Sequence, residues 1–362
     1  MREQDVGAGF RVGHAAGRDW RSVLDDCLEQ LGPRADGDNI VFAYCTDHFA
    51  EFASEILNRL QIRTRVATVI GATAMGVVAT ASEYIGEPAM AIMIGALPAD
   101  SFTPFASASR RERGWFGVVH ADPQAPALPE LLGDFAEASG AYLVGGVLAP
   151  RSRQFAAAVI DSGVSGVLFS EAVTVVTGLT QGCSPIGPPH TITACEANII
   201  QELDDRPAYQ VLREVAGAGL MRNLEKLGQT IMVGIPVTGA DRPDYLVRNL
   251  MGVDAKEGMI AVGSLVEENQ ALLFCRRDTE AAKQDFERML TDLRLRVGNR
   301  RPRGALYHLC IARGANMFGP GEWEMQRIAE TFPDLPLIGC SCNGEIAGGR
   351  LYGYTGVLSL FL

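Results

Sequence analysis

The residues that could perform covalent or redox chemistry are cysteines that follow apolar, strand-like runs. Cys340 and Cys342 form a C-x-C pair, and Cys310 stands three residues before Arg313. Because residues i and i+2 of a strand face the same side, both thiols of the pair are expected to point into one space. A guanidinium that points at a thiol lowers its pKa, which would make Cys310 reactive. The alternative is that these cysteines are small core residues, and the spacing leaves both interpretations open.

Other catalytic signatures are missing from the sequence. There is no G-x-x-x-x-G-K-[ST] phosphate loop, no G-x-G-x-x-G after a strand and no H-E-x-x-H. Two G-x-S sequences, at 182–187 and 339–344, each have one residue too many for a G-x-S-x-G nucleophile elbow. The five histidines, at positions 14, 48, 120, 190 and 308, include no pair at i, i+4 spacing. We therefore assign no catalytic residue and no metal site, and the sequence favours a binding protein over an enzyme.

The composition narrows the class of protein. The chain has 362 residues, of which 47% are hydrophobic and 21% charged, with 32 basic and 43 acidic side chains and a net charge of −11. So much apolar material supports an extensive core and excludes disorder. A net negative charge disfavours nucleic acids and anionic membranes as partners. The longest apolar runs are of strand length, short of the roughly 20 residues that span a membrane, and we expect a cytoplasmic protein.

Periodic patterns predict helices alternating with short strands. Apolar residues recur at steps of three and four after Asp19, which is a good N-cap, and again within 49–60, 128–135 and 282–293. Short β-branched or apolar runs indicate strands. They lie at 40–44, 68–71, 90–94, 117–119, 142–144, 166–169, 173–176, 231–237, 259–262, 271–275, 306–311, 337–339 and 356–362. This mixture predicts an α/β or α+β fold.

An internal repeat connects the two ends of the chain. Residues 69–79 align with 337–347, with four identical positions that include Ile70-Gly71 and Ile338-Gly339. The flanking strands align at nearly the same spacing, which predicts two related sheet-plus-helix domains arranged as a pseudo-duplicated pair. We expect 181–189 to be a rigid turn, and we place the domain division between residues 1–201 and 202–362.

Several stretches, in this order and spacing, resemble the FIST domain family. They are Gln181-Gly-Cys-Ser-Pro-Ile-Gly-Pro-Pro189, Glu202-Leu-Asp-Asp-Arg-Pro-Ala208, Asp244-Tyr-Leu-Val-Arg-Asn-Leu250 with Gly252 and Asp254, Cys310-Ile-Ala-Arg-Gly314 with Phe318 and Gly319, and Cys342-Asn-Gly-Glu-Ile346 followed by Gly353-Tyr-Thr355. The resemblance extends over residues 30–201 for an N-terminal FIST region and 202–362 for a C-terminal one. It implies a sensory module for small ligands such as amino acids. It also implies a signalling partner such as a histidine kinase.

The motifs of the second region suit a ligand pocket. Glu345 offers a carboxylate to an ammonium group, and Asn343 offers amide donors and an acceptor. Arg313 and Arg248 offer planar forks for a carboxylate. The remaining expected ligand-binding residues are Cys310, Gly314, Cys342 and Gly344. One acidic and one basic pole fit an amino acid or small carboxylate, although Glu345 and an arginine could instead pair with each other within the fold.

Two rival functions remain. Relatives that sense nitric oxide through haem imply an alternative in which His308, His190 or His48 is an axial ligand; no C-x-x-C-H is present, so attachment would be non-covalent. The other is a thiol-dependent enzyme with Cys310 or Cys342 as nucleophile. We favour a ligand-binding sensor that needs no cofactor.

Overall fold

The computed structural model describes residues 9–107, 113–237 and 244–362. The chain folds into two compact units. Unit 1 consists of the described parts of residues 1–180 together with 286–362, and unit 2 of those of 181–285. None of the helices within these described ranges is long and apolar enough to cross a membrane.

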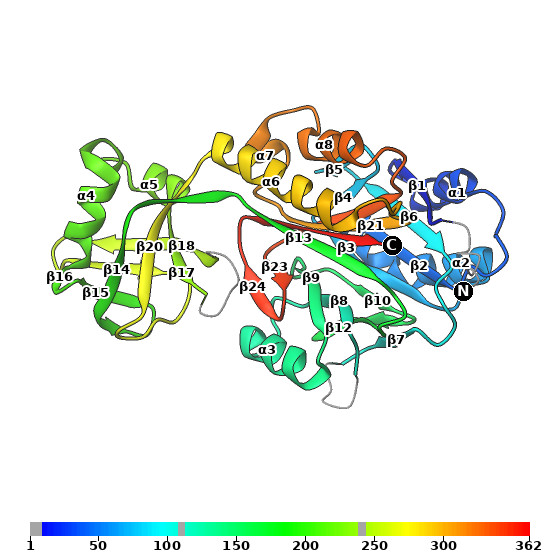
Figure 1. The fold of residues 1–362 in the computed structure, drawn as a ribbon, viewed down its shortest axis with the longest axis horizontal. Helices are drawn as coiled ribbons and strands as arrows, with labels where there is room; N and C mark the ends of the chain where they lie inside the picture. The colour runs from blue at the N-terminus through cyan, green and yellow to red at the C-terminus, as the bar shows by residue number, and fades with distance from the viewer. Residues whose placement is uncertain (1–8, 108–112, 238–243) are drawn as a thin grey trace. The chain divides into compact units, whose positions relative to one another are not determined.

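Unit 1 contains three six-stranded sheets whose strands follow one another in an equivalent order. Most of these strands are labelled in Figure 1. Sheet 1 comprises β1 (Arg11–Ala16), β6 (Ala89–Gly95), β2 (Ile40–Thr46), β3 (Val69–Ala74), β10 (Gln154–Ala156) and β11 (Val159–Ile160). Sheet 2, in the same order, comprises β7 (Phe102–Phe105), β12 (Val164–Phe169), β8 (Phe116–Ala121), β9 (Tyr142–Val147), β23 (Glu345–Ala347) and β24 (Arg350–Tyr352). Sheet 3 comprises β13 (Val175–Gln181), β25 (Thr355–Phe361), β21 (Gly304–Cys310), β22 (Leu337–Cys342), β4 (Gly76–Ala79) and β5 (Ser82–Ile85). Unit 1 is therefore built from three repeats.

The repeats exchange hairpins. Repeat 1 (11–95) lends β4 and β5 to sheet 3, repeat 2 (102–169) lends β10 and β11 to sheet 1, and repeat 3 (175–181 with 304–361) lends β23 and β24 to sheet 2. The first strand of each lent hairpin runs antiparallel to the second strand of a central parallel pair, and the second strand of the hairpin forms the edge of the sheet. Because each sheet includes strands from two repeats, no repeat completes its hydrogen-bonded ladder alone.

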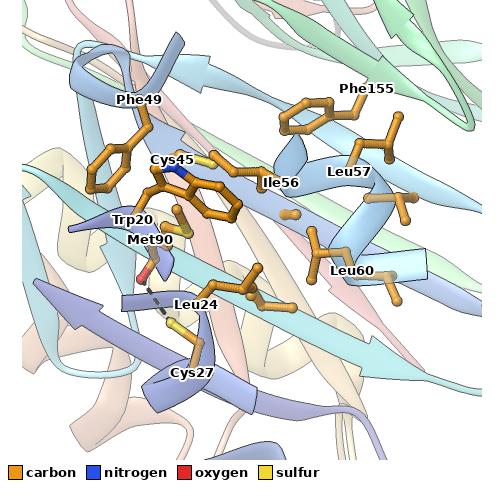
Figure 2. Close-up of a cluster of buried hydrophobic side chains, with 14 of the residues drawn as sticks. Trp20, Leu24, Cys27, Cys45, Phe49, Ile56, Leu57, Leu60, Met90 and Phe155 are labelled. Atoms are coloured by element: carbon orange, nitrogen blue, oxygen red, sulfur yellow. Dashed lines mark hydrogen bonds between the residues drawn. The ribbon is translucent and has the colours of Figure 1, made fainter. Parts of the chain in front are cut away.

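Helices with apolar faces cover these sheets, and the cap of the first helix is specified by neighbouring residues. Helix α1 (Trp20–Leu31) begins where the Asp19 carboxylate accepts a hydrogen bond from Ser22 N at 3.1 Å, and it ends before Gly32. Its apolar face and that of α2 (Ala53–Thr64), which follows the 3₁₀ turn η1 (Asp47–Phe52), pack over sheet 1. Figure 2 shows this core, in which the Cys27 thiol donates to the Met90 carbonyl at 3.7 Å. Helix α3 (Leu128–Ser139) packs in the core of sheet 2, and α6 (Thr279–Val297) and α8 (Trp323–Thr331) in that of sheet 3; the short α7 (Ala315–Phe318) precedes α8.

One glycine position recurs in the second central strand of each sheet. A side chain at Gly71, Gly145 or Gly339 would overlap a backbone carbonyl of the neighbouring strand. The close approach of the two strands therefore requires glycine at this position in all three repeats. The match between 69–79 and 337–347 in the sequence found two of these three equivalent positions.

The described residues of unit 2 form a seven-stranded sheet on which helices α4 (Ala208–Met221) and α5 (Leu224–Thr230) pack. Its strands, in order, are β14 (Cys183–Glu196), β20 (Ala271–Arg277), β17 (Ile231–Pro236), β18 (Tyr245–Asp254), β19 (Met259–Val262), β15 (Ile199–Leu203) and β16 (Arg206–Pro207). Strand β14 also pairs with β15, so the sheet closes on itself. The apolar side chains of these two helices share one core with the strands.

The mixed α+β class predicted from the sequence is confirmed, and each run predicted as a strand overlaps a strand. The expected rigid turn at 181–189 is wrong, because most of it belongs to β14. Pro188 and Pro189 are accommodated because the pairing with β20 is interrupted between Ile186 and His190, where no ladder hydrogen bond is needed. The division expected after residue 201 lies within β15 of unit 2.

Candidate functional site

Three polar side chains meet in the interior of unit 1. Tyr44, His120 and His308 occupy equivalent positions in β2, β8 and β21. Each follows directly after the residue that pairs with Gly71, Gly145 or Gly339 of the neighbouring strand. The Tyr44 hydroxyl lies 3.0 Å from His120 Nε2 and 2.9 Å from His308 Nε2. All three side chains are completely buried. We call this group the central triad, and it shows that the three sheets converge on a common point.

The central triad is uncharged at neutral pH. Burial lowers the pKa of His120 to about 3, with a smaller contribution from His308, and lowers that of His308 to about 4. A single hydroxyl proton can serve only one imidazole, so Tyr44 donates to one Nε2 and accepts from the protonated Nε2 of the other. The Nδ1 atoms of both histidines are buried without a hydrogen-bond partner among the described residues.

Glu345 is a second buried group with an unusual ionisation. It begins β23 and is completely enclosed, and its Oε2 accepts from Thr355 N at 3.0 Å and Thr355 Oγ1 at 2.7 Å. Its Oε1 is buried and accepts no hydrogen bond of normal geometry within the described part of the chain. Burial raises the pKa of Glu345 to about 8, against smaller opposing effects of Thr355, Arg313 and the nearby Cys310 thiol. Glu345 is therefore mostly protonated at neutral pH and has an unused polar atom.

The cysteines are packed as core residues. Cys340 and Cys342 face the same side of β22, as their spacing predicted, with their sulfur atoms 3.8 Å apart and both side chains fully buried. Burial, followed by the nearby Glu345 carboxyl, raises the pKa of the Cys310 thiol to about 12. The pKa of Cys342 is also raised, first by its hydrogen bond with Cys340 and then by burial. These environments suppress the thiolate that nucleophilic catalysis requires.

Arg313 is held by a partner inside the fold. Its Nη2 and Nε lie 2.8 and 3.1 Å from Glu324 Oε1 on α8, and both side chains are almost completely buried. The Tyr307 hydroxyl donates to the same oxygen at 2.7 Å, and Gly314 N donates to Glu324 Oε2 at 3.2 Å. The sequence allowed for an internal pair between Glu345 and an arginine; the structure instead pairs Arg313 with Glu324.

Seven of the eight expected ligand-binding residues lie in unit 1, around the ends of β21 and β22. In this region Ile311 N donates to the Cys342 carbonyl at 3.0 Å, which joins the segment after β21 to the segment before Glu345. Asn343 is exposed and Gly344 is buried at φ 131°, between β22 and β23. Arg248 belongs to β18 of unit 2, where its Nη1 donates to the Val247 carbonyl at 2.9 Å.

The three histidines considered for haem lie in different environments. His308 belongs to the central triad, so it is enclosed and its Nε2 is engaged by Tyr44. His190, in unit 2, contacts Asp204 through Nδ1 at 2.7 Å, and His48 is 42% exposed beside Thr46. His308 does not fit an axial ligand, because an axial histidine needs a ring nitrogen that the iron can reach, and its Nε2 contacts Tyr44 within an enclosed core. Within the described ranges, no three His, Cys, Asp or Glu side chains are grouped to hold a metal ion.

Sequence reasoning missed the central triad and Glu324. The triad could have been found by aligning repeat 2 on its glycine, Gly145, because Tyr44, His120 and His308 then fall in register. Glu324 carried no such signal, since it lies on a helix in an ordinary amphipathic pattern. Its role depends on α8 packing against the buried face of β21 that bears Tyr307.

Comparison with known proteins matches this chain over most of its length. The FIST N domain family matches residues 39–206 and the FIST C domain family residues 208–348. The chain is 29% identical over 337 residues to the uncharacterized protein Rv0628c of Mycobacterium tuberculosis (strain ATCC 25618 / H37Rv), covering 86% of this chain and 88% of that protein. It is 30% identical over 237 residues to the uncharacterized protein Mb0898c of Mycobacterium bovis, covering 62% of this chain and 61% of that protein.

The fold and these matches define a sensory protein of the kind that binds small ligands. The chain belongs to the FIST family, with both its N and C domains present. The family boundary between residues 206 and 208 differs from the limits of the compact units, because the FIST C match includes unit 2 strands and the β21–β23 region of unit 1.

Proposed function

We propose that unit 1 binds a small molecule that carries a protonated amino group, such as an amino acid, and that the protein reports binding to a separate signalling partner. The observation that carries this proposal is Glu345, a completely buried carboxyl with an unused Oε1 and a pKa raised to about 8. A ligand ammonium group would donate to Oε1 and compensate the charge of the carboxylate, which burial otherwise disfavours.

The neighbouring residues favour an amino acid over a simple carboxylate. Arg313, the basic pole expected from the sequence, is engaged by Glu324. The exposed amide of Asn343, two residues before Glu345, can donate to the carboxylate of a ligand. Access to Glu345 would require the half-exposed segment at Tyr354 to move. Tyr354 has φ 61°, a strained conformation for a residue other than glycine, so a change of this segment can release strain.

Proton release gives a direct test. At pH 7 a carboxyl with a pKa of about 8 is roughly nine-tenths protonated. Binding of an ammonium group would convert Glu345 to carboxylate and release its proton to solvent. Titration calorimetry of amino acids in buffers of different ionisation enthalpy should therefore show about 0.9 protons released per ligand at pH 7. Propylamine should bind more weakly than alanine, and propionate should not bind at this site.

Two variants decide whether Glu345 is responsible. Glu345→Gln keeps the shape of the protonated side chain and should abolish both binding and proton release. Glu137→Gln, which alters an exposed carboxyl on α3, is the matched control and should change neither. Amino-acid binding with no proton release, or unchanged binding by Glu345→Gln, would overturn the proposal. A Soret band in the purified protein would instead support the haem alternative.

The signalling partner and location remain part of the same proposal. We propose a histidine kinase as the partner and the cytoplasm as the compartment. The compartment is supported by eight cysteines that are all free thiols, as expected in a reducing environment. A kinase encoded by the same organism should change its autophosphorylation rate when the wild-type protein and ligand are added together. An unchanged rate with every such kinase would refute signalling through this class of partner.

A further inference from the structure

A separate cavity of unit 1 lies where two helices end. It has a volume of about 120 Å³ and is bordered by the last turns of α1 and α2, by the start of β1 and by β6. A cavity of about 150 Å³ can hold a molecule the size of benzene. The cavity can therefore accommodate a ligand of up to about six heavy atoms.

The charged side chains that line the cavity are all arginines: Arg11, Arg34 and Arg63. Arg11 Nη1 donates to the carbonyls of Leu31 and Pro33 at 2.8 and 2.6 Å, which satisfies the end of α1. Its Nε is buried and has no hydrogen-bond partner in the described chain. Each guanidinium has five N–H donors, so an anion could be bound without breaking these contacts.

The surrounding ion pairs leave an excess of positive charge. Asp38 pairs with Arg11, and its backbone carbonyl accepts from Arg34 Nη2 at 3.2 Å. Asp25 is shared between Arg63 and Arg59, with nitrogen–oxygen distances of 2.8 and 2.7 Å. Three guanidiniums, those of Arg11, Arg34 and Arg63, thus line the cavity, and neither carboxylate does. The cavity is therefore electrostatically suited to an anion.

One wall of the same cavity is apolar. It is formed by Leu28 and Leu31 of α1 and Ile94 of β6. Leu31 and Ile94 are buried, so this wall excludes water from one side of the site. A dianion such as phosphate has no group to place against such a surface. An amphipathic anion satisfies both sides, because its charge meets the arginines and its tail meets the leucines and isoleucine.

We propose that this cavity binds a small monocarboxylate with a short aliphatic chain. The carboxylate lies between Arg34 and Arg63 and accepts from Arg11 Nε, and the aliphatic chain contacts Leu28 and Ile94. The site shares no residue with the region around Glu345. It would thus give the protein a site for a second class of ligand, an anion held by arginines, whereas Glu345 would bind a cationic group.

The test uses butyrate as the probe with the full-length protein. Titration calorimetry at low salt should detect butyrate binding, with weaker or no binding of butanol, butylamine and inorganic phosphate. Arg34→Gln and Arg63→Gln should each weaken butyrate binding about tenfold, as expected for loss of a charge-assisted hydrogen bond. Both side chains are exposed at the cavity mouth, so the variants should remain folded, which circular dichroism can verify.

Arg59→Gln is the matched control, because Arg59 shares Asp25 with Arg63 but does not line the cavity. It should bind butyrate like the wild type. The proposal is overturned if butanol binds as well as butyrate, if phosphate binds better, or if Arg34→Gln and Arg63→Gln bind normally. Glu345→Gln should retain butyrate binding, so the result is independent of the amino-acid proposal.

Discussion

The ionisation of Glu345 should make the stability of unit 1 fall as the pH rises through neutrality. Its pKa is raised from an ordinary value of 4.5 to about 8 by burial. The folded state therefore holds a proton that the unfolded chain has already released above pH 4.5. Because stability decreases with pH wherever the folded state binds more protons, this contribution is present below pH 4.5 and is lost as pH rises through 8.

The expected magnitude follows from the same shift. Between pH 5 and pH 7.5 one such group changes the free energy of unfolding by about 1.4 kcal/mol per pH unit, or roughly 3 kcal/mol in total. Glu345→Gln lacks the titrating proton and should not show this loss. The variant should therefore become more stable relative to the wild type by roughly 3 kcal/mol over this interval. Any constant cost of the amide leaves this pH dependence unchanged.

Urea unfolding followed by tryptophan fluorescence measures the pH dependence of the free energy of unfolding of unit 1. Trp20, Trp115 and Trp323 all belong to unit 1, so the signal reports on the part of the chain that contains Glu345. Glu137→Gln serves again as the control and should track the wild type at every pH. A stability difference between wild type and Glu345→Gln that does not vary from pH 5 to 7.5 would show that Glu345 ionises normally in the folded protein.

Three further predictions concern buried groups and thiols. Tyr44→Phe should lower the free energy of unfolding by about 1–3 kcal/mol, because two buried imidazole nitrogens lose their hydroxyl partner; an unchanged urea midpoint would contradict these hydrogen bonds. Arg313→Met should cost about 3–5 kcal/mol by leaving Glu324 charged without its cation, and adding Glu324→Leu should recover much of that loss; equal urea midpoints for the single and double variants would argue against the pair. A small alkylating reagent should label the partly exposed Cys195 before Cys310, whose pKa burial raises to about 12; early modification of Cys310 in a mass spectrum would refute its enclosed environment.

Much of the local structure could be predicted from the sequence. Asp19 and the apolar positions after it specify α1, since capping and a 3.6-residue period act between near neighbours. The shared orientation of Cys340 and Cys342 follows from the two-residue period of a strand. The similarity around Gly71 and Gly339 reflects a tight approach of neighbouring strands, where no side chain fits.

The third repeat could not be recognised in the same way. Tyr44, His120 and His308 occupy one structural position but share no single residue type, and the described residues between the first two strands of repeat 2 form no helix. Unit 2 separates β13 from the rest of repeat 3, which further obscures the pattern. The exchange of hairpins also depends on pairing between distant strands, and a short strand such as β23 does not itself specify its neighbour.

The candidate site illustrates the same limit. The sequence alone indicated Cys310, Arg313 and Glu345 as candidate ligand-binding residues. It also indicated that the Glu345 carboxylate suits an ammonium group. The tertiary structure alone determined that Arg313 pairs with Glu324 and that Glu345 retains an unused oxygen. Periodicity and capping act over a few residues and can be read along the chain. Burial, ion-pair partners and the pKa values that depend on them arise only when distant segments pack together.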